Sequence, residues 1–177
     1  AVRGVEALLR WDSPDFGRVS PVEFIPIAEA KGYIIAIGKW VALQAIAAQV
    51  RWREQQAVDE YFTVAINVAS AQLMQPDFAD WLIAATAQAG LPAYSLEIEV
   101  TESGLMHDMQ LAMQQLQCLA AAGFGIAIDD FGTGYSSLAY LKVLPVSVIK
   151  IDRAFVSEMH TNTQDQRLTN TVIDMAR

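Results

Sequence analysis

The strongest constraint on the fold is the regular alternation of short strand-like runs with longer helical runs along the 177-residue chain. Such alternation implies parallel strands joined by right-handed crossovers. We expect strands at Val2–Ala7, Thr63–Asn67, Leu96–Thr101, Phe124–Asp129 and Val148–Asp152. Amphipathic stretches that predict helices lie around residues 21–30, 36–56, 71–89, 107–122 and 165–176. The sequence therefore predicts one α/β domain with a parallel sheet.

Within each predicted strand, large aliphatic residues occupy one face and small or polar residues the other. In residues 96–101, Leu96 and Ile98 share one face, whereas Glu99 lies on the other, toward the carboxyl end. The aliphatic faces suit packing under helices. When every strand brings a polar residue to the same end, the pattern is typical of a (β/α) barrel, because an open doubly wound sheet gathers such groups at one switch point. We expect a TIM-like barrel, with about five of its eight strands in this chain.

Local signals mark the helix ends and the class of protein. Ser20–Glu23 reads as a capping box with Pro21 at the first helical position. A single cysteine, Cys118, excludes an internal disulfide, fits a cytoplasmic protein and is expected to be a small buried hydrophobe. The net charge of −8 argues against a nucleic-acid polymer as partner. The longest apolar-rich segment, residues 33–50, is broken by polar residues, so no membrane span is expected.

Five side chains at predicted strand ends are candidate metal ligands. Four are carboxylates and one is an amide, and such oxygen donors are preferred by Mg²⁺, Mn²⁺ or Ca²⁺. They are Glu6, Asn67, Glu99, Asp129 and Asp130. The two histidines, His107 and His160, are not at strand ends, which disfavours a zinc site. An acidic protein can still bind a phosphodiester if its carboxylates first collect divalent cations.

Several candidate site residues also have an ordinary structural explanation. Asp129 and Asp130 repel each other unless a cation intervenes, but they also fit a solvated turn with Asp130 as a helix cap. Lys150, on the same predicted face, would orient a metal-bound water or simply neutralise a nearby carboxylate. Arg10 would hold a phosphate or be a surface charge. The spacing leaves these alternatives open.

Several motifs, in order along the whole chain, resemble the EAL domain family of cyclic-di-GMP phosphodiesterases. The ten residues from Asp129 to Leu138 match that family's DDFGTGYSSL segment without a mismatch. Glu6–Trp11 resembles the EAL motif, and Ser20–Gly32 is similar to the family's SPxEFIPxAExxG helix. Glu99–Ser103 and Lys150–Asp152 resemble ExTES and KID.

The resemblance implies a TIM-like barrel that hydrolyses cyclic-di-GMP to the linear dinucleotide with two Mg²⁺ or Mn²⁺ ions in the complete domain. It assigns the first metal to Glu6, Asn67, Glu99 and Asp129, and the second to Asp129 and Asp130. It implies that Lys150 holds the nucleophilic water, Glu102 anchors the loop of residues 132–137, Arg10 contacts a substrate phosphate and Asp152 supports the site.

The same resemblance predicts how this chain relates to its parent protein. Residues 1–177 would be a single partial domain that lacks the family's first strand. It would also lack the last strands, and these last strands carry the AEGVE-type glutamates. The isolated piece would then be inactive. Ala69 stands where the family usually has serine. The alternative function is a non-hydrolytic cyclic-di-GMP receptor of the same fold. The parent is expected to be a homodimer with a flanking sensor or diguanylate cyclase domain. A membrane anchor, if the parent has one, would lie in the missing regions.

Overall fold

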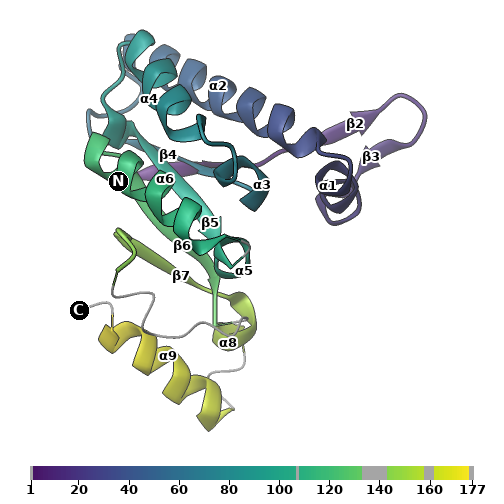
Figure 1. Cartoon of the computed structure of the whole chain (residues 1–177), viewed down its shortest axis with the longest axis vertical. Helices are drawn as coiled ribbons and strands as arrows, with labels where there is room; N and C mark the ends of the chain where they lie inside the picture. The colour runs from purple at the N-terminus through teal and green to yellow at the C-terminus, as the bar shows by residue number, and fades with distance from the viewer. Residues whose placement is uncertain (1, 107, 133–142, 158–161, 176–177) are drawn as a thin grey trace.

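The computed structural model describes residues 2–106, 108–132, 143–157 and 162–175. Its centre is a five-stranded parallel sheet in the order β1-β4-β5-β6-β7, curled into a half-barrel (Figure 1). The strands are β1 (Gly4–Ala7), β4 (Thr63–Asn67), β5 (Leu96–Thr101), β6 (Gly125–Phe131) and β7 (Val148–Ile151). The five predicted strands and their parallel arrangement are therefore confirmed, with small shifts at their ends.

Helices cover the outer face of this sheet. The described helices are α1 (Pro21–Ala30), α2 (Tyr33–Glu54), α3 (Ser70–Leu73), α4 (Phe78–Gln88), α5 (Glu102–Leu105), α6 (Met109–Ala122), α8 (Arg153–Ser157) and α9 (Thr163–Met175), with a 3₁₀ turn η1 (Ala93–Ser95). Figure 1 shows α2, α4 and α6 on one side of the sheet. The single helix predicted at residues 71–89 is wrong, since it divides into α3 and α4 around Pro76, which cannot continue a helix.

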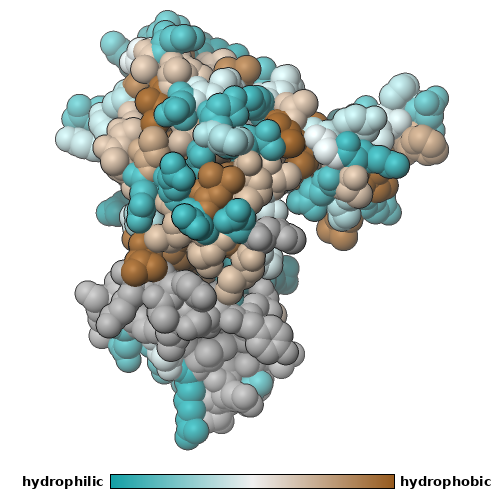
Figure 2. Space-filling view, in the orientation of Figure 1, coloured by the Kyte–Doolittle hydropathy of each residue, from teal (hydrophilic) through white to brown (hydrophobic). Residues whose placement is uncertain are grey.

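A small hairpin that the periodicity did not predict precedes α1. Its strands, β2 (Trp11–Ser13) and β3 (Gly17–Val19), pair antiparallel. Together with α1 the hairpin forms an arm that stands away from the body of the molecule (Figures 1 and 2). The turn enters β3 through Gly17 at a φ of 66°, a conformation that glycine adopts without strain. Strands of three residues contain too few positions to show an alternation.

The core forms where the aliphatic faces of the strands meet the helices. Leu96 and Ile98 on β5 have no exposed surface, and Ile126 on β6 is 1 % exposed. The side chain of Gln49, on α2, is also buried and donates to the carbonyls of Phe62 (2.5 Å) and Ser95 (3.2 Å). This amide satisfies two backbone acceptors just before β4 and β5, so it fixes α2 over the starts of these strands.

Two local predictions are wrong. Ser20 is the N-cap residue of α1, with Pro21 at the first helical position as expected, but its side chain makes no capping hydrogen bond. The helix start instead relies on backbone bonds, including one from Glu23 N to Ser20 O of 2.9 Å. Cys118 is exposed rather than buried, because it lies outside the buried stripe of α6 formed by Ala112, Gln115, Leu116 and Leu119.

The helix α2 is the one helix among the described residues with the length and apolar composition to cross a membrane. Core helices of water-soluble proteins satisfy the same criterion. In this fold Ala42, Ala45 and Ile46 belong to the core cluster shared with the sheet. The apolar composition of α2 is therefore accounted for, in part, by its packing.

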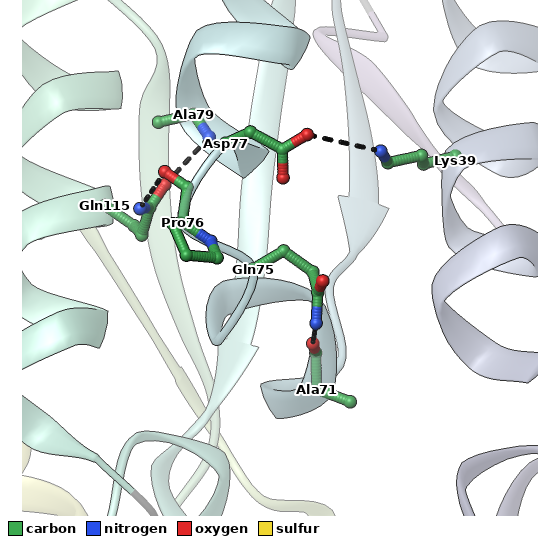
Figure 3. Close-up of polar contacts among 7 residues, drawn as sticks. All are labelled: Lys39, Ala71, Gln75, Pro76, Asp77, Ala79 and Gln115. Carbon is green, nitrogen blue, oxygen red and sulfur yellow. Dashed lines mark hydrogen bonds and ion pairs between the residues drawn. The ribbon is translucent and has the colours of Figure 1, made fainter. Parts of the chain in front are cut away.

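The start of α4 is held by a side chain from another helix (Figure 3). Gln115, on α6, accepts from the backbone N–H of Ala79 (2.8 Å) and donates to the carbonyl of Pro76 (3.0 Å). Asp77 at the N-cap position makes no capping bond of its own and instead lies 3.9 Å from Lys39. A buried amide therefore supplies the cap that the local sequence does not.

We expect Gln115→Leu to lower the free energy of unfolding by about 1–3 kcal/mol, because the N–H of Ala79 would be left buried without an acceptor. Equilibrium unfolding in urea measures the loss. Gln114→Leu is the matched control, since Gln114 is the exposed neighbour on the same helix. Equal effects of the two substitutions would show that Gln115 does not cap α4.

Candidate active site

The polar ends of the first four sheet strands are aligned by their pairing. Asn67 on β4 is in register with Glu99 on β5, and Thr101 is in register with Asp129 on β6. Partners in a parallel sheet project to the same face. At the edge of this group, the Asn67 side-chain amide donates to Glu6 Oε1 on β1 over 2.7 Å. The sheet thus brings the predicted polar residues of β1, β4, β5 and β6 to one end of its inner face.

Glu99 is the deepest of these carboxylates, with 1 % of its surface exposed. Lys150 on β7 donates to its Oε1 and forms an ion pair with it. The contact crosses the intervening strand β6, where the register partner of Glu99 is Ala127. A small residue at this point leaves room for the lysine side chain to pass. The second oxygen, Oε2, is buried and has no hydrogen-bond partner within the described part of the chain.

The balance of charge at this end of the sheet is strongly acidic. Burial raises the pKa of Glu99, Lys150 partly offsets that effect, and the nearby charges of Glu6 and Asp129 raise the pKa further. For Lys150, burial lowers the pKa, but the hydrogen bond and charge of Glu99 outweigh it and raise the pKa above its usual value. One lysine therefore faces several carboxylates, an arrangement that favours an additional cation.

The adjacent aspartates at the end of β6 occupy a distorted stretch of backbone. Asp130 has a φ of 52°, a left-handed value uncommon outside glycine, and the pairing of β6 with β7 shifts register between Ile128 and Phe131. Its backbone N–H donates to Asp129 Oδ1 (2.9 Å). Burial, the charge of Asp129 and the contact with Asp152 all raise the pKa of Asp130. The two carboxylates are thus held beside each other by a bulge, as is common near functional sites.

Glu102 connects the end of β5 to the segment that follows β6. It is buried, and its Oε2 accepts from the backbone N–H of Gly132 (2.9 Å). The preceding Thr101 caps the short helix α5 by accepting from Gly104 N (3.2 Å). Gly132 itself has a φ of 102°. The rest of the loop predicted to cover the site, residues 133–137, lies outside the described residues, as do His107 and His160.

A cleft of about 550 Å³ opens beside Asn67 and Glu99. Its size falls within the roughly 300–1,000 Å³ of small-molecule sites. Arg10 also lines it, is exposed, and donates to the carbonyl of Leu9 (2.8 Å). The remaining walls come mainly from α1, α2 and the turns after β4 and β5.

The residues at this site fit a hard divalent cation by their chemistry. They supply carboxylate and amide oxygens, and the orphaned Oε2 of Glu99 is a buried acceptor that lacks a partner. Among the described residues, however, no three histidine, cysteine or acidic side chains already form a metal-binding group. Lys150 and Asn67 occupy one oxygen each of Glu99 and Glu6. Binding of a cation would therefore require these side chains to rearrange.

Comparison with known proteins identifies the family. The model of the EAL domain matches residues 1–177. The chain belongs to the EAL domain family.

Curated relatives of this EAL domain are longer signalling proteins. It is 40 % identical, over 98 % of its length, to the bifunctional diguanylate cyclase/cyclic di-GMP phosphodiesterase MucR of Pseudomonas aeruginosa, and spans 25 % of that protein. It is 34 % identical, over 99 % of its length, to the cyclic di-GMP phosphodiesterase PdeR of Escherichia coli, and spans 26 % of it. The chain thus corresponds to about a quarter of each relative.

Solved structures agree with the fold. A MucR phosphodiesterase structure, a complex with c-di-GMP, superposes with a TM-score of 0.89 at 38 % identity, covering 99 % of this chain and 70 % of that one. The FimX EAL domain of Pseudomonas aeruginosa, bound to c-di-GMP, gives a TM-score of 0.85 at 28 % identity, covering 99 % and 69 %. The expectation of an EAL domain with a barrel-type sheet is confirmed.

The structure adds features of this EAL domain that the motifs did not reveal. Ala127 provides the space through which Lys150 reaches Glu99, but alanine in a buried strand gives no such signal in a sequence. The helix α5 begins at Glu102 with Thr101 as its cap, and a threonine three residues before Gly104 is the one local sign of it. Glu29, on α1, lines the cleft; it belongs to the Ser20–Gly32 segment that resembles a family motif, but that resemblance gave it no role.

The raised pKa of Glu99 predicts how stability depends on pH. The folded chain retains this proton more strongly than the unfolded chain, so stability should fall as pH rises from the ordinary glutamate value of 4.5 through the raised folded pKa. Glu99→Gln should remove this part of the slope in unfolding free energy measured at a series of pH values. Glu97→Gln, on the same face of the same strand, should leave it in place; a slope unchanged by Glu99→Gln would contradict the assignment.

Proposed function

We propose that the complete protein containing this chain hydrolyses cyclic-di-GMP to the linear dinucleotide, with Mg²⁺ or Mn²⁺ as cofactor. The observation that carries the proposal is the buried Glu99 carboxylate, with one orphaned oxygen, among other carboxylates at the strand ends of an EAL domain. Relatives named as cyclic di-GMP phosphodiesterases support the substrate and the reaction. The volume of the cleft, about 550 Å³, supports a small-molecule substrate.

The assignment of the metal ligands rests on the resemblance to the EAL domain family, and their oxygen donors are consistent with it. Glu6, Asn67, Glu99 and Asp129 would hold one ion, and Asp129 and Asp130 a second. Ions held there would lower the pKa of a bound water and neutralise charge on the phosphodiester. Because the acidic groups repel each other without a cation, the ligands themselves favour binding.

The chain's other polar groups have roles in binding and orientation. Lys150, once released from Glu99, would hold the attacking water and face the charge that develops on the phosphate. Arg10 would contact a phosphate oxygen of the substrate from the wall of the cleft. Glu102 would fix the start of the following loop through Gly132, and Asp152, which accepts from Ala154 N (2.6 Å), would support the end of β7 beside Asp130.

A second candidate is a non-hydrolytic receptor for cyclic-di-GMP. A solved structure of the FimX EAL domain bound to c-di-GMP supports it. Against it, both aspartates at the end of β6 and the glutamate of β1 are in place. We also propose that the parent protein is cytoplasmic at this domain, forms homodimers and carries a flanking sensor or cyclase domain. The length of the curated relatives supports the flanking domain.

The deciding experiment follows hydrolysis of cyclic-di-GMP by the complete protein, with Mg²⁺ or Mn²⁺ and with a chelator. We expect metal-dependent product, and loss of activity by at least ~100-fold in Glu6→Ala and in Asp129→Ala, because each removes a ligand. Glu54→Ala, an exposed acid at the end of α2, is the control. Binding without product in the unmodified protein would establish the receptor instead.

Lys150→Ala separates binding from chemistry. A water-holding lysine acts mainly in the transition state, so the substitution should lower kcat by ~10–100-fold and change the dissociation constant of cyclic-di-GMP much less. Steady-state kinetics and calorimetry of the complete protein provide the two values. Equal losses in turnover and binding would assign Lys150 to substrate binding or to structural support of Glu99.

A further inference from the structure

The cleft beside the strand ends has two chemically different parts. Toward the sheet it is lined by Asn67 and Glu99, the candidate metal ligands. Away from the sheet it lies between two helices, with Ile34, Ile37 and Val41 of α2 on one wall. A ligand that fills both parts combines a charged group with a flat or apolar one, as a nucleotide does.

The wall contributed by α1 consists of Pro21, Ile25 and Glu29. These residues are spaced four apart, so they follow one another along a single face of the helix. Two of them are apolar and the last is a carboxylate. The face that α1 turns to the cleft therefore offers an apolar surface that ends in an acceptor.

The position of Glu29 is not explained by the stability of α1. It lies in the last turn, where the partial negative charge of the helix end disfavours a carboxylate, and that turn contains no basic residue. Within the described residues its side chain has no hydrogen bond or ion pair, while its backbone carbonyl accepts from Gly32 N (3.0 Å). The carboxylate is thus an open acceptor at the mouth of the apolar part of the cleft.

We infer that Glu29 recognises the guanine base of the substrate through its N1–H and N2–H groups. The inference rests on the proposed function. A carboxylate accepts two parallel hydrogen bonds from these neighbouring donors, whereas adenine presents an acceptor at N1. The base would lie against the apolar residues of α1 and α2, with the phosphodiester toward Asn67 and Glu99. Glu29 is then a specificity-determining residue that contacts substrate away from the reacting phosphate.

The test compares cyclic-di-GMP with cyclic-di-IMP, which keeps N1–H and lacks the 2-amino group. In the complete protein, Glu29→Gln should weaken binding of cyclic-di-GMP by about 10–100-fold, the range for a hydrogen bond to a charged group. It should weaken binding of cyclic-di-IMP less, so the ratio of the affinity for cyclic-di-GMP to that for cyclic-di-IMP falls. Calorimetry with a chelator prevents turnover, and kinetics with metal should show kcat within about threefold of the unmodified protein.

Glu23→Gln is the matched control, because Glu23 lies on the same helix but does not line the cleft. It should leave affinity and preference unchanged. The inference is overturned if Glu29→Gln retains the original preference, or if it weakens both dinucleotides equally, as a structural or long-range charge effect would. If the unmodified protein neither binds nor hydrolyses cyclic-di-GMP, the proposed function itself fails, an outcome that the measurements on that protein reveal independently.

Discussion

The register of the parallel sheet is the constraint on which the candidate site depends. Because strands β4, β5 and β6 run in the same direction and pair with one another without a register shift, residues that are distant in sequence emerge at the same end. A slip of one residue in β5 would turn Glu99 into the helix-facing core and Ile98 into the cleft. The large aliphatic residues of the outer face prevent such a slip, so the packing of the core also positions the polar residues.

This coupling explains why a buried carboxylate is tolerated. Burial alone makes ionised Glu99 unfavourable, and the nearby acids add to the effect. Lys150 offsets it by reaching across β6, where Ala127 leaves space. Breaking a buried pair by removing one partner is far more destabilising than the pair is stabilising. Glu99 and Lys150 therefore form a coupled pair in the folded chain, and removal of either one would leave the charge of the other uncompensated.

The sequence predicted the sheet well because each strand has a strict alternation of large aliphatic with small or polar residues. Thr63–Asn67 and Leu96–Thr101 were predicted to the residue. Prediction from the sequence failed where a feature depends on tertiary contacts or where an element is too short to show a pattern. The hairpin of Trp11–Val19 consists of three-residue strands, and the cap of α4 comes from Gln115, which lies 36 positions after the N–H that it satisfies. Cys118 was misplaced because helical periodicity alone does not identify which stripe of α6 faces the core.

The candidate site could likewise be predicted from the sequence only in part. Strand parity predicted that Glu6, Asn67, Glu99 and Asp129 would come to one end of the sheet, since that depends only on alternation and direction. It did not predict that Glu99 would be paired with Lys150 and Glu6 with Asn67, because side-chain partners depend on which neighbours are small enough to allow contact. Glu29 was not predicted as a site residue. Its place on the cleft follows from the angle at which α1 leaves the body of the molecule, and no local pattern encodes that angle. Site residues on strands can thus be predicted from this sequence. Site residues on the arm formed by the hairpin and α1 can be identified only once the packing of the helices is known.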